Sequence, residues 1–239
     1  MSNNSVISCL YPNKCAVCDE IIREGNVFCE YCGRVINNID YRNWCVKCGL
    51  PKDVCRCKIR EFRFSGIVAA YINSGAAQKA YYSYKIGRRE ELAPFFAKKA
   101  ANAVKTVFGD LHFDAVISVP NSKSGLLRRG FDHGGKIAAG LSDILGLPYL
   151  RGVLKVKPFK SKQHKSSFAD RLENVRGKYY TVKRLNIKRV LLFDDIYTTC
   201  ATLDECAKEL MFAGVGEVYC AAVLSTSRKK KQTGVNNGN

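Results

Sequence analysis

The segment from Val190 to Leu203 constrains the fold more than any other part of the chain. Four apolar residues lead into two adjacent carboxylates, Asp194 and Asp195, and a loop of small and hydroxyl-bearing residues then precedes a helical pattern. A short apolar run of this kind indicates a strand that is buried on both faces. The segment therefore predicts a strand, loop and helix unit of an α/β protein, with the acids where the strand ends.

The residue types in this unit suit a phosphorylated sugar. Adjacent carboxylates can accept hydrogen bonds from vicinal sugar hydroxyls. The hydroxyls of Thr198, Thr199 and Thr202, with the loop amides, can surround a phosphate at the positive end of the following helix. Two alternatives are a strand edge with two solvated acids and a Mg²⁺ site of the response-regulator kind. In receivers of that kind, however, the acidic pair follows the first strand.

The rest of the chain after residue 58 alternates between strand and helix patterns. Strands are predicted over Phe62–Tyr71, Phe113–Val119 and Val218–Leu224, and helices around Phe96–Val107, Ile137–Leu145 and Leu203–Leu210. This alternation favours right-handed crossovers and a mainly parallel sheet covered on both faces. Ligands of such sheets bind at the carboxyl ends of the strands, where we expect both Pro120 and Asp194.

Two further loops belong to this predicted site. The loop Pro120, Asn121, Ser122 and Lys123 follows a strand and is expected to lie opposite the first loop; the alternative is a basic surface loop. The stretch from 150 to 178 is polar and basic. It is expected to be a mobile loop that closes over the ligand, or else a solvated connection.

Eight of the twelve cysteines form four close pairs within residues 15–57. Two thiolates of a Cys-x-x-Cys turn can converge on one ion, and two such turns complete the tetrahedral sulfur shell that Zn²⁺ prefers. We expect two Zn²⁺ ions held sequentially, with a single full site or interleaved pairing as alternatives. The expected ligand sets are Cys15, Cys18, Cys29 and Cys32 for one ion, and Cys45, Cys48, Cys55 and Cys57 for the other.

Other residues of this region follow from the same chemistry. Gly33 and Gly49 follow cysteines and are expected to adopt backbone angles that favour glycine. Large apolar residues are few there, so metal binding is expected to supply much of the folding free energy. Cys206 and Cys220 are predicted to be buried thiols, and no histidine is assigned to a metal.

The charge balance points to polyanionic partners. The chain has 39 basic and 21 acidic residues, a net charge of +18. Seventeen of the basic residues and only four acidic ones fall between Lys123 and Arg189. The N-terminus carries no secretory-signal pattern and no apolar run is long enough to cross a bilayer. With twelve cysteines in metal-like spacing, a cytoplasmic location without membrane insertion is expected.

The segment Asp194–Thr202 resembles the 5-phosphoribosyl 1-pyrophosphate (PRPP) signature of the type I phosphoribosyltransferases, with Cys200 where glycine is most usual. The chain as a whole resembles the ComF family, which is linked to natural competence and includes gluconate-utilisation-associated relatives. The further matching features are the Cys-x-x-Cys pairs with Cys48-Gly49-Leu50-Pro51, Tyr84-Lys85, Arg128-Arg129-Gly130-Phe131, Gln163, and Arg171-Leu172-Glu173-Asn174-Val175-Arg176-Gly177. The family's usual Arg-Gly-Phe-Asn-Gln is here Arg129-Gly130-Phe131-Asp132-His133.

The resemblance implies a type I phosphoribosyltransferase-like domain over residues 59–227, a cysteine-rich zinc module over 1–58 and a basic tail over 228–239. It implies that Mg²⁺–PRPP is the ligand. The implied PRPP-binding residues are Asp194, Asp195, Thr198, Thr199, Cys200, Ala201, Thr202, Pro120, Asn121 and Lys123. No acceptor-activating base can be named, so turnover stays open; Lys162 and Arg171 are loop candidates for a catalytic role.

A role in DNA uptake is the second implication. Single-stranded DNA could be held by charge and stacking, through the candidates Arg88, Arg128, Arg129, Phe131, Lys160, Lys162 and Lys165, with Tyr81, Tyr82, Tyr84 and Phe159 nearby in sequence. Three alternatives remain: a phosphoribosyltransferase acting on an unidentified acceptor without a DNA role, a non-catalytic DNA-binding module, and a zinc module that docks a partner helicase or another competence protein.

Overall fold

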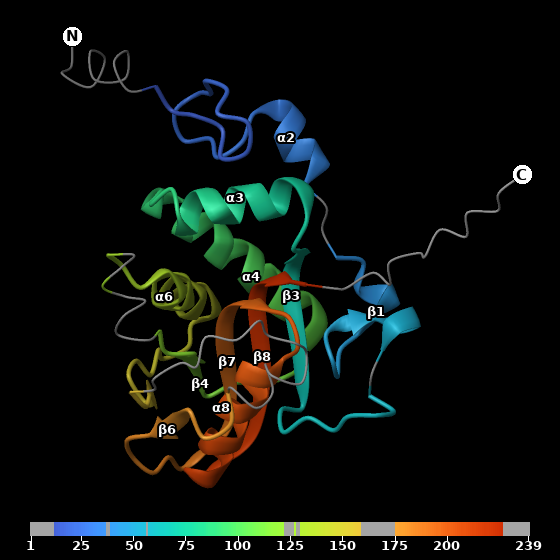
Figure 1. The fold of residues 1–239 in the computed structure, drawn as a ribbon, viewed down its shortest axis with the longest axis vertical. Coiled ribbons are helices and arrows are strands. Elements are labelled where there is room, and N and C mark those ends of the chain that lie inside the picture. Colours follow the sequence, from blue (N-terminus) through green and yellow to red (C-terminus); the bar gives the residue numbers. More distant parts are fainter. Residues whose placement is uncertain are drawn as a thin grey trace, which may run out of the picture.

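A parallel sheet forms the centre of the molecule (Figure 1). The computed structural model describes residues 12–36, 39–55, 57–121, 127, 130–158 and 175–226. The sheet has the order β3-β8-β7-β4, and every neighbouring pair is parallel. Its strands are β3 (Gly66–Ile72), β4 (Ala115–Ser118), β7 (Ile187–Tyr197) and β8 (Val215–Ser225). The strands are apolar at successive positions because both faces of the sheet are covered.

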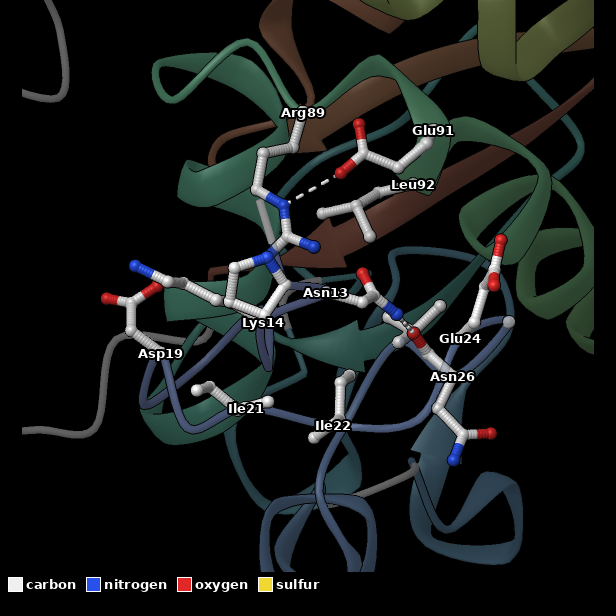
Figure 2. A pocket seen from close by; sticks show the side chains of 13 residues that line it. Asn13, Lys14, Asp19, Ile21, Ile22, Glu24, Asn26, Arg89, Glu91 and Leu92 are labelled. Carbon is white, nitrogen blue, oxygen red and sulfur yellow. Dashed lines mark hydrogen bonds and ion pairs between the residues drawn. The ribbon is translucent and has the colours of Figure 1, made fainter. Parts of the chain in front are cut away.

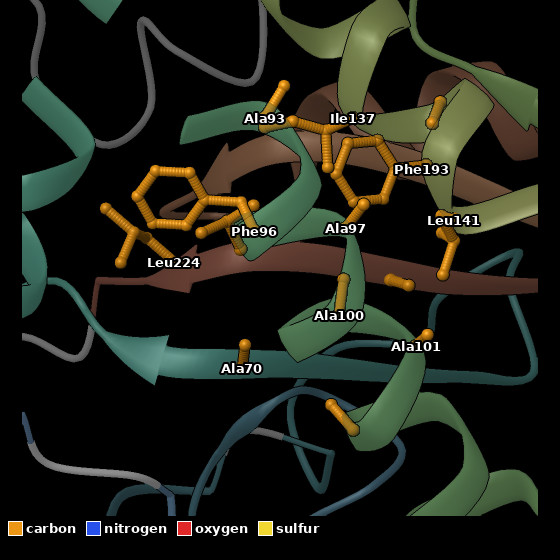
Figure 3. Close-up of a cluster of buried hydrophobic side chains, with 14 of the residues drawn as sticks. Ala70, Ala93, Phe96, Ala97, Ala100, Ala101, Ile137, Leu141, Phe193 and Leu224 are labelled. Carbon is orange, nitrogen blue, oxygen red and sulfur yellow. The ribbon is translucent and has the colours of Figure 1, made fainter. Parts of the chain in front are cut away.

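Three helices cover one face of the sheet: α3 (Gly75–Lys85), α4 (Ala93–Phe108) and α6 (His133–Leu145). The short 3-10 helix η3 (Glu90–Leu92) leads into α4. Figure 3 shows Ala97 of α4 close to Ile137 of α6 and Phe193 of β7, and the ring of Phe96 beside Leu224 of β8. The many alanines of α4 let it pack closely on the sheet. We call this side of the sheet the α4 face.

The opposite side, the α8 face, is covered by α8 (Ala201–Phe212). An antiparallel pair, β5 (Leu154–Val156) and β6 (Tyr179–Thr181), also lies on this side. Its core includes Leu192 of β7 and Leu203 and Cys206 of α8, all fully buried. The predictions that Cys206 and Cys220 are buried are both confirmed.

The two cysteine-rich segments pack on opposite faces of the sheet. The first contains α2 (Glu30–Val35), and its Ala16 and Phe28 contact the α4 face, with the rings of Phe28 and Phe95 4.9 Å apart. The second contains η1 (Tyr41–Asn43), the strands β1 (Trp44–Cys45) and β2 (Leu50–Pro51), and η2 (Lys52–Val54). Its Trp44 is buried in the core of the α8 face. The first segment thus packs on the α4 face, whereas the second lies mainly in the core of the α8 face, with Tyr41 contacting both.

The predicted fold class is confirmed: a mainly parallel sheet, flanked by helices, follows cysteine-rich segments. One strand differs in its bounds. The sequence places a strand from Phe62, whereas β3 begins at Gly66; the rings of Phe62 and Phe64 stack on each other instead, 4.9 Å apart. Within the described ranges, none of the helices is long and apolar enough to span a membrane.

Candidate functional site

Asp194 and Asp195 lie inside β7, not after it as the sequence suggests. The pairing of β7 with β4 stops at Phe193, but its pairing with β8 continues to Tyr197. β7 therefore extends past the end of its neighbour, and both acids sit on this extension. Because successive strand residues point to opposite faces, Asp195 faces α3 and α6. Asp194 faces α8, where its charge adds to burial in raising the pKa of Cys206.

The carboxylate of Asp195 is held by three donors from two helices. Its Oδ2 accepts hydrogen bonds from the Tyr81 hydroxyl at 2.7 Å and the Lys85 Nζ at 2.6 Å, both on α3, and lies 2.8 Å from Nε2 of His133 at the start of α6. His133 is buried, and its Nδ1 has no hydrogen-bond partner among the described residues. Oδ1 accepts the amide of Ile196 at 2.8 Å. Asp195 is therefore a fixed, partly covered anion.

The two neighbouring acids have opposite electrostatic environments. Burial opposes ionisation of Asp195, but the His133 hydrogen bond and the Lys85 charge hold the pKa of its carboxyl well below its usual range. Burial and the adjacent Asp195 charge raise the pKa of Asp194 well above its usual value. The surroundings therefore favour the ionised form of Asp195 and the protonated form of Asp194.

The loop after β7 forms a tight entry into α8. Cys200 has the left-handed φ of 59°, which is uncommon for a residue other than glycine. The Thr199 hydroxyl accepts the amide of Ala201 at 3.3 Å, and Thr198 is exposed. The loop thus combines accessible hydroxyls with the N-terminus of a twelve-residue helix, the arrangement that suits a phosphate.

The loop after β4 lies beside the same end of the sheet. Val119 donates its amide to the Phe193 carbonyl at 2.8 Å, which holds the start of this loop against β7. Nδ2 of Asn121 donates to Oδ1 of Asp132 at 2.7 Å, and the same oxygen caps α6 through the amide of Gly135 at 2.8 Å. Pro120 and Asn121 therefore lie in the predicted region, and Lys123 is outside the described residues.

Sequence reasoning did not give a site role to three residues that the tertiary structure brings to Asp195. Tyr81 and Lys85 are four residues apart, a spacing that places both on one side of α3; this spacing was a usable signal. His133 and Asp132 occupy the two positions where the chain differs from the ComF pattern, and each contacts one of the site loops or acids. These positions are thus part of the site.

The eight predicted cysteine ligands form two clusters with the sequential grouping that the sequence favours. In each cluster the four sulfur atoms lie within 4.8 Å of one another, so each can hold one Zn²⁺ in a tetrahedral thiolate shell. Burial disfavours the thiolates of Cys15 and Cys45, but hydrogen bonds within the clusters outweigh it and lower the pKa of both thiols to about 7. Burial and the neighbouring thiols raise the pKa values of Cys32 and Cys57 well above their usual value, so metal binding has to displace protons from these ligands.

Gly33 corrects one expectation of the sequence analysis. Gly49 has the left-handed φ of 65°, as predicted, but Gly33 lies within α2 and is not among the glycines with positive φ. The chain after Cys32 continues as a helix, so the first cluster needs no special backbone angle there.

The aromatic residues expected to stack on DNA bases are mostly covered by protein. Tyr81, Tyr84 and Phe131 are buried, because the three rings pack on each other and on α4. They therefore do not offer open faces for stacking. Tyr82 is 40% exposed and Arg88 is exposed. Arg128, Arg129, Phe159, Lys160, Lys162, Lys165 and Arg171 lie outside the described residues.

A cavity of about 780 Å³ lies away from the acids, between the first cysteine segment and η3 (Figure 2). Its polar lining carries both signs of charge: Lys14, Asp19 and Glu24 on one side, and Arg89, paired with Glu91 at 2.8 Å, on the other. Among the described residues, its lining includes none of the predicted site residues.

The parallel sheet, with helices on both faces and loops at the carboxyl ends of β4 and β7, defines an α/β protein. Solved structures similar to it include a purine phosphoribosyltransferase from Pyrococcus horikoshii, at 21% identity and a TM-score of 0.36, covering 57% of this chain and 76% of that one. An adenine phosphoribosyltransferase is 11% identical with a TM-score of 0.39, covering 59% and 74%.

In sequence, the chain is similar to Competence protein F of Haemophilus influenzae. The two are 32% identical over 108 residues, which is 44% of this chain and 47% of that protein. The chain thus matches about half the length of this curated relative. No family model matches the chain.

Proposed function

We propose that this protein binds Mg²⁺–PRPP at the carboxyl end of its sheet and also binds single-stranded DNA in natural transformation. The observation that carries the proposal is the pair of acids on the extension of β7, followed at once by the loop and N-terminus of α8. Carboxylates suit sugar hydroxyls and Mg²⁺, and the helix N-terminus suits a phosphate. The similarity to Competence protein F supports the role in natural transformation, and we propose that this role is carried out in the cytoplasm.

Three parts of PRPP are proposed to have separate contacts with the protein. Residues 198–202 hold the 5′-phosphate, and the loop of Pro120, Asn121 and Lys123 holds the pyrophosphate. Asp194 and Asp195 hold the ribose hydroxyls, directly or through Mg²⁺. Oδ2 of Asp195 already accepts three hydrogen bonds, but its Oδ1 accepts only one from the described residues. A ribose hydroxyl can therefore be added at Oδ1 without displacing Lys85 or His133.

Calorimetric titration with Mg²⁺–PRPP tests the proposal. Loss of the carboxylates in Asp194→Ala plus Asp195→Ala is expected to weaken binding at least about 100-fold, because hydrogen bonds to charged groups contribute roughly 1.5–3 kcal/mol each. Exposed Asp110→Ala is the matched control, since Asp110 follows α4 and has no site role. Absence of PRPP binding by the unmutated protein would overturn the proposal.

DNA binding is supported by the net charge of +18. Arg88, Arg128, Arg129, Lys160, Lys162 and Lys165 are the proposed phosphate contacts. Titration of a labelled oligonucleotide is expected to give an affinity that falls steeply as salt is raised, because counterions are released on binding. The double aspartate variant should bind the oligonucleotide as the unmutated protein does. An affinity that does not respond to salt would contradict the DNA part alone.

A further inference from the structure

The second cysteine cluster is joined to β7, the strand that leads into the proposed phosphate loop, and to its neighbour β8. The carbonyl of Gly49, one residue after the ligand Cys48, accepts the hydroxyl of Tyr197 at 2.8 Å and that of Ser225 at 3.3 Å. Tyr197 is the last residue of β7 and Ser225 is the last residue of β8. One turn of the cluster thus rests on the ends of two neighbouring strands.

This approach is close enough to require a glycine. A Cβ on Gly49 would lie 2.5 Å from the Tyr197 hydroxyl and 2.8 Å from Cγ2 of Ile67, besides the left-handed φ of 65°. The amide of Ile67 also donates to the Val46 carbonyl within the same turn, at 2.7 Å. The Cys-x-x-Cys turn therefore packs on the sheet backbone itself.

The loop contacts the same cluster directly. Sγ of Cys200 lies 3.8 Å from the carbonyl of the ligand Cys48, a weak thiol hydrogen bond. Cys200 is the residue with the left-handed backbone, and it stands where the type I signature most often has glycine. An uncommon backbone conformation persists where surrounding contacts hold it, and here the contact comes from the metal-binding turn.

A second connection comes from the residues that follow the last ligand, Cys57. Arg60 donates from Nη1 to the Thr199 carbonyl at 2.8 Å and pairs through Nη2 with Asp204 in the first turn of α8, at 3.6 Å. The amide of Arg63 donates to the same Asp204 carboxylate at 2.6 Å. The Arg60 side chain is only 19% exposed, so solvent does not substitute readily for these contacts.

We propose that Zn²⁺ in the second cluster fixes the conformation of residues 198–204, so that metal occupancy there and phosphate binding at the loop are thermodynamically coupled. The ligand half of this inference rests on the proposed function. Coupling of this kind is reciprocal: metal raises the affinity for the phosphate ligand, and the ligand raises the affinity for the metal by the same factor. Cys200 and Arg60 act as positioning residues.

The first cluster provides an internal contrast. Its segment packs against α4 on the opposite face of the sheet, through Ala16 and the contact of Phe28 with Phe95. Within the described residues, none of its hydrogen bonds reaches the loop 198–204. The proposal therefore predicts that the two metals act differently on the loop.

Hydrogen exchange by mass spectrometry on the zinc-loaded full chain tests the positioning without any ligand. Cys57→Ser removes a ligand of the second cluster, and Cys18→Ser removes one from the first. Amides of residues 198–204 are expected to exchange at least about tenfold faster in Cys57→Ser than in Cys18→Ser. Equal protection of these amides in both variants would overturn the proposal.

Arg60→Gln separates loop positioning from metal loss, because Arg60 is not a ligand. Its zinc content is expected to stay at that of the unmutated protein, while exchange of residues 198–204 rises and PRPP affinity falls by about 5- to 50-fold. Unchanged exchange with full zinc would contradict the inference, even if Cys57→Ser does not fold. If the unmutated protein does not bind PRPP, the proposed function fails, but the exchange data still decide whether the cluster positions the loop.

Discussion

The carboxylate of Asp195 lies among Tyr81, Lys85 and His133, whereas that of Asp194 faces the apolar surroundings of α8. Successive strand residues point to opposite faces, so the two side chains have different surroundings. Asp195 is paired with Lys85 at 2.6 Å, whereas Asp194 forms no ion pair with the described residues, and the Lys85 charge only partly offsets the burial that raises its pKa. The signature pair is thus chemically unequal in this protein. We expect the difference to appear in stability as well as in binding.

Asp194→Asn and Asp195→Asn are predicted to change stability in opposite directions at pH 7. Asp194→Asn removes a charge that burial disfavours and should raise the free energy of unfolding by about 1 kcal/mol. Asp195→Asn leaves Lys85 with no carboxylate partner in this cluster and should lower it by about 3 kcal/mol. Urea denaturation measures both.

The pH dependence gives the control for this prediction. Folding raises the pKa of Asp194, so this carboxyl holds a proton in the folded state at pH values where it is ionised in the unfolded chain. The free energy of unfolding therefore falls as pH rises through the pKa of the folded state. The advantage of Asp194→Asn over the unmutated protein should therefore shrink as pH is lowered from 7 toward 4. An advantage that grows with acid would contradict the assignment.

At the scale of elements, the unit β7–loop–α8 depends on a segment more than a hundred residues earlier in the chain. Gly49 supports the ends of β7 and β8, and Arg60 holds the start of α8. The cysteine turn and the strand ends therefore form one packed junction rather than two separate modules.

Gly49→Ala and Gly33→Ala form a matched pair, since each glycine directly follows a cysteine ligand. Gly49→Ala is predicted to lower the free energy of unfolding by about 2 kcal/mol or more, because the Cβ collides with Tyr197 and φ is left-handed. In Gly33→Ala the new Cβ would meet only Cβ of Phe28, at 3.8 Å, inside a helix. This change should be neutral or stabilising by a few tenths of a kcal/mol. Similar losses from both changes, measured by thermal denaturation, would argue against the junction.

At the scale of the whole molecule, the two cysteine clusters attach to opposite faces of one sheet. Each segment contributes some apolar residues to the core, but the short 3-10 helices and two-residue strands of the second segment offer little regular structure of their own. Its conformation is expected to depend on metal.

Metal analysis of the purified protein is predicted to find two Zn²⁺ per chain. Chelation should lower the melting temperature by more than about 5 °C, because the free energy of structural zinc binding is also folding free energy. Re-addition of Zn²⁺ should restore the original value. A single Zn²⁺ per chain, or a melting temperature that chelation leaves unchanged, would contradict this prediction.

The local sequence determined much of this protein. The apolar runs and helical spacings predict the alternating elements and the parallel sheet, because buried strands and amphipathic helices have distinct periodicities. The cysteine spacing predicts the two clusters because close pairs can share an ion. The order of residues from Val190 to Thr202 predicts acids, loop and helix in the right succession.

Only the tertiary structure decided how these parts meet. That Asp195 is bound by Lys85 and His133, and that the Cys48–Gly49 turn rests on Tyr197 and Cys200, are contacts between residues 62 to 152 positions apart in the chain. The continuation of β7 past Asp194 likewise depends on pairing with β8, not on the residues of β7 alone. Local propensity carries no information about such partners, because they are set by which faces the crossovers bring together.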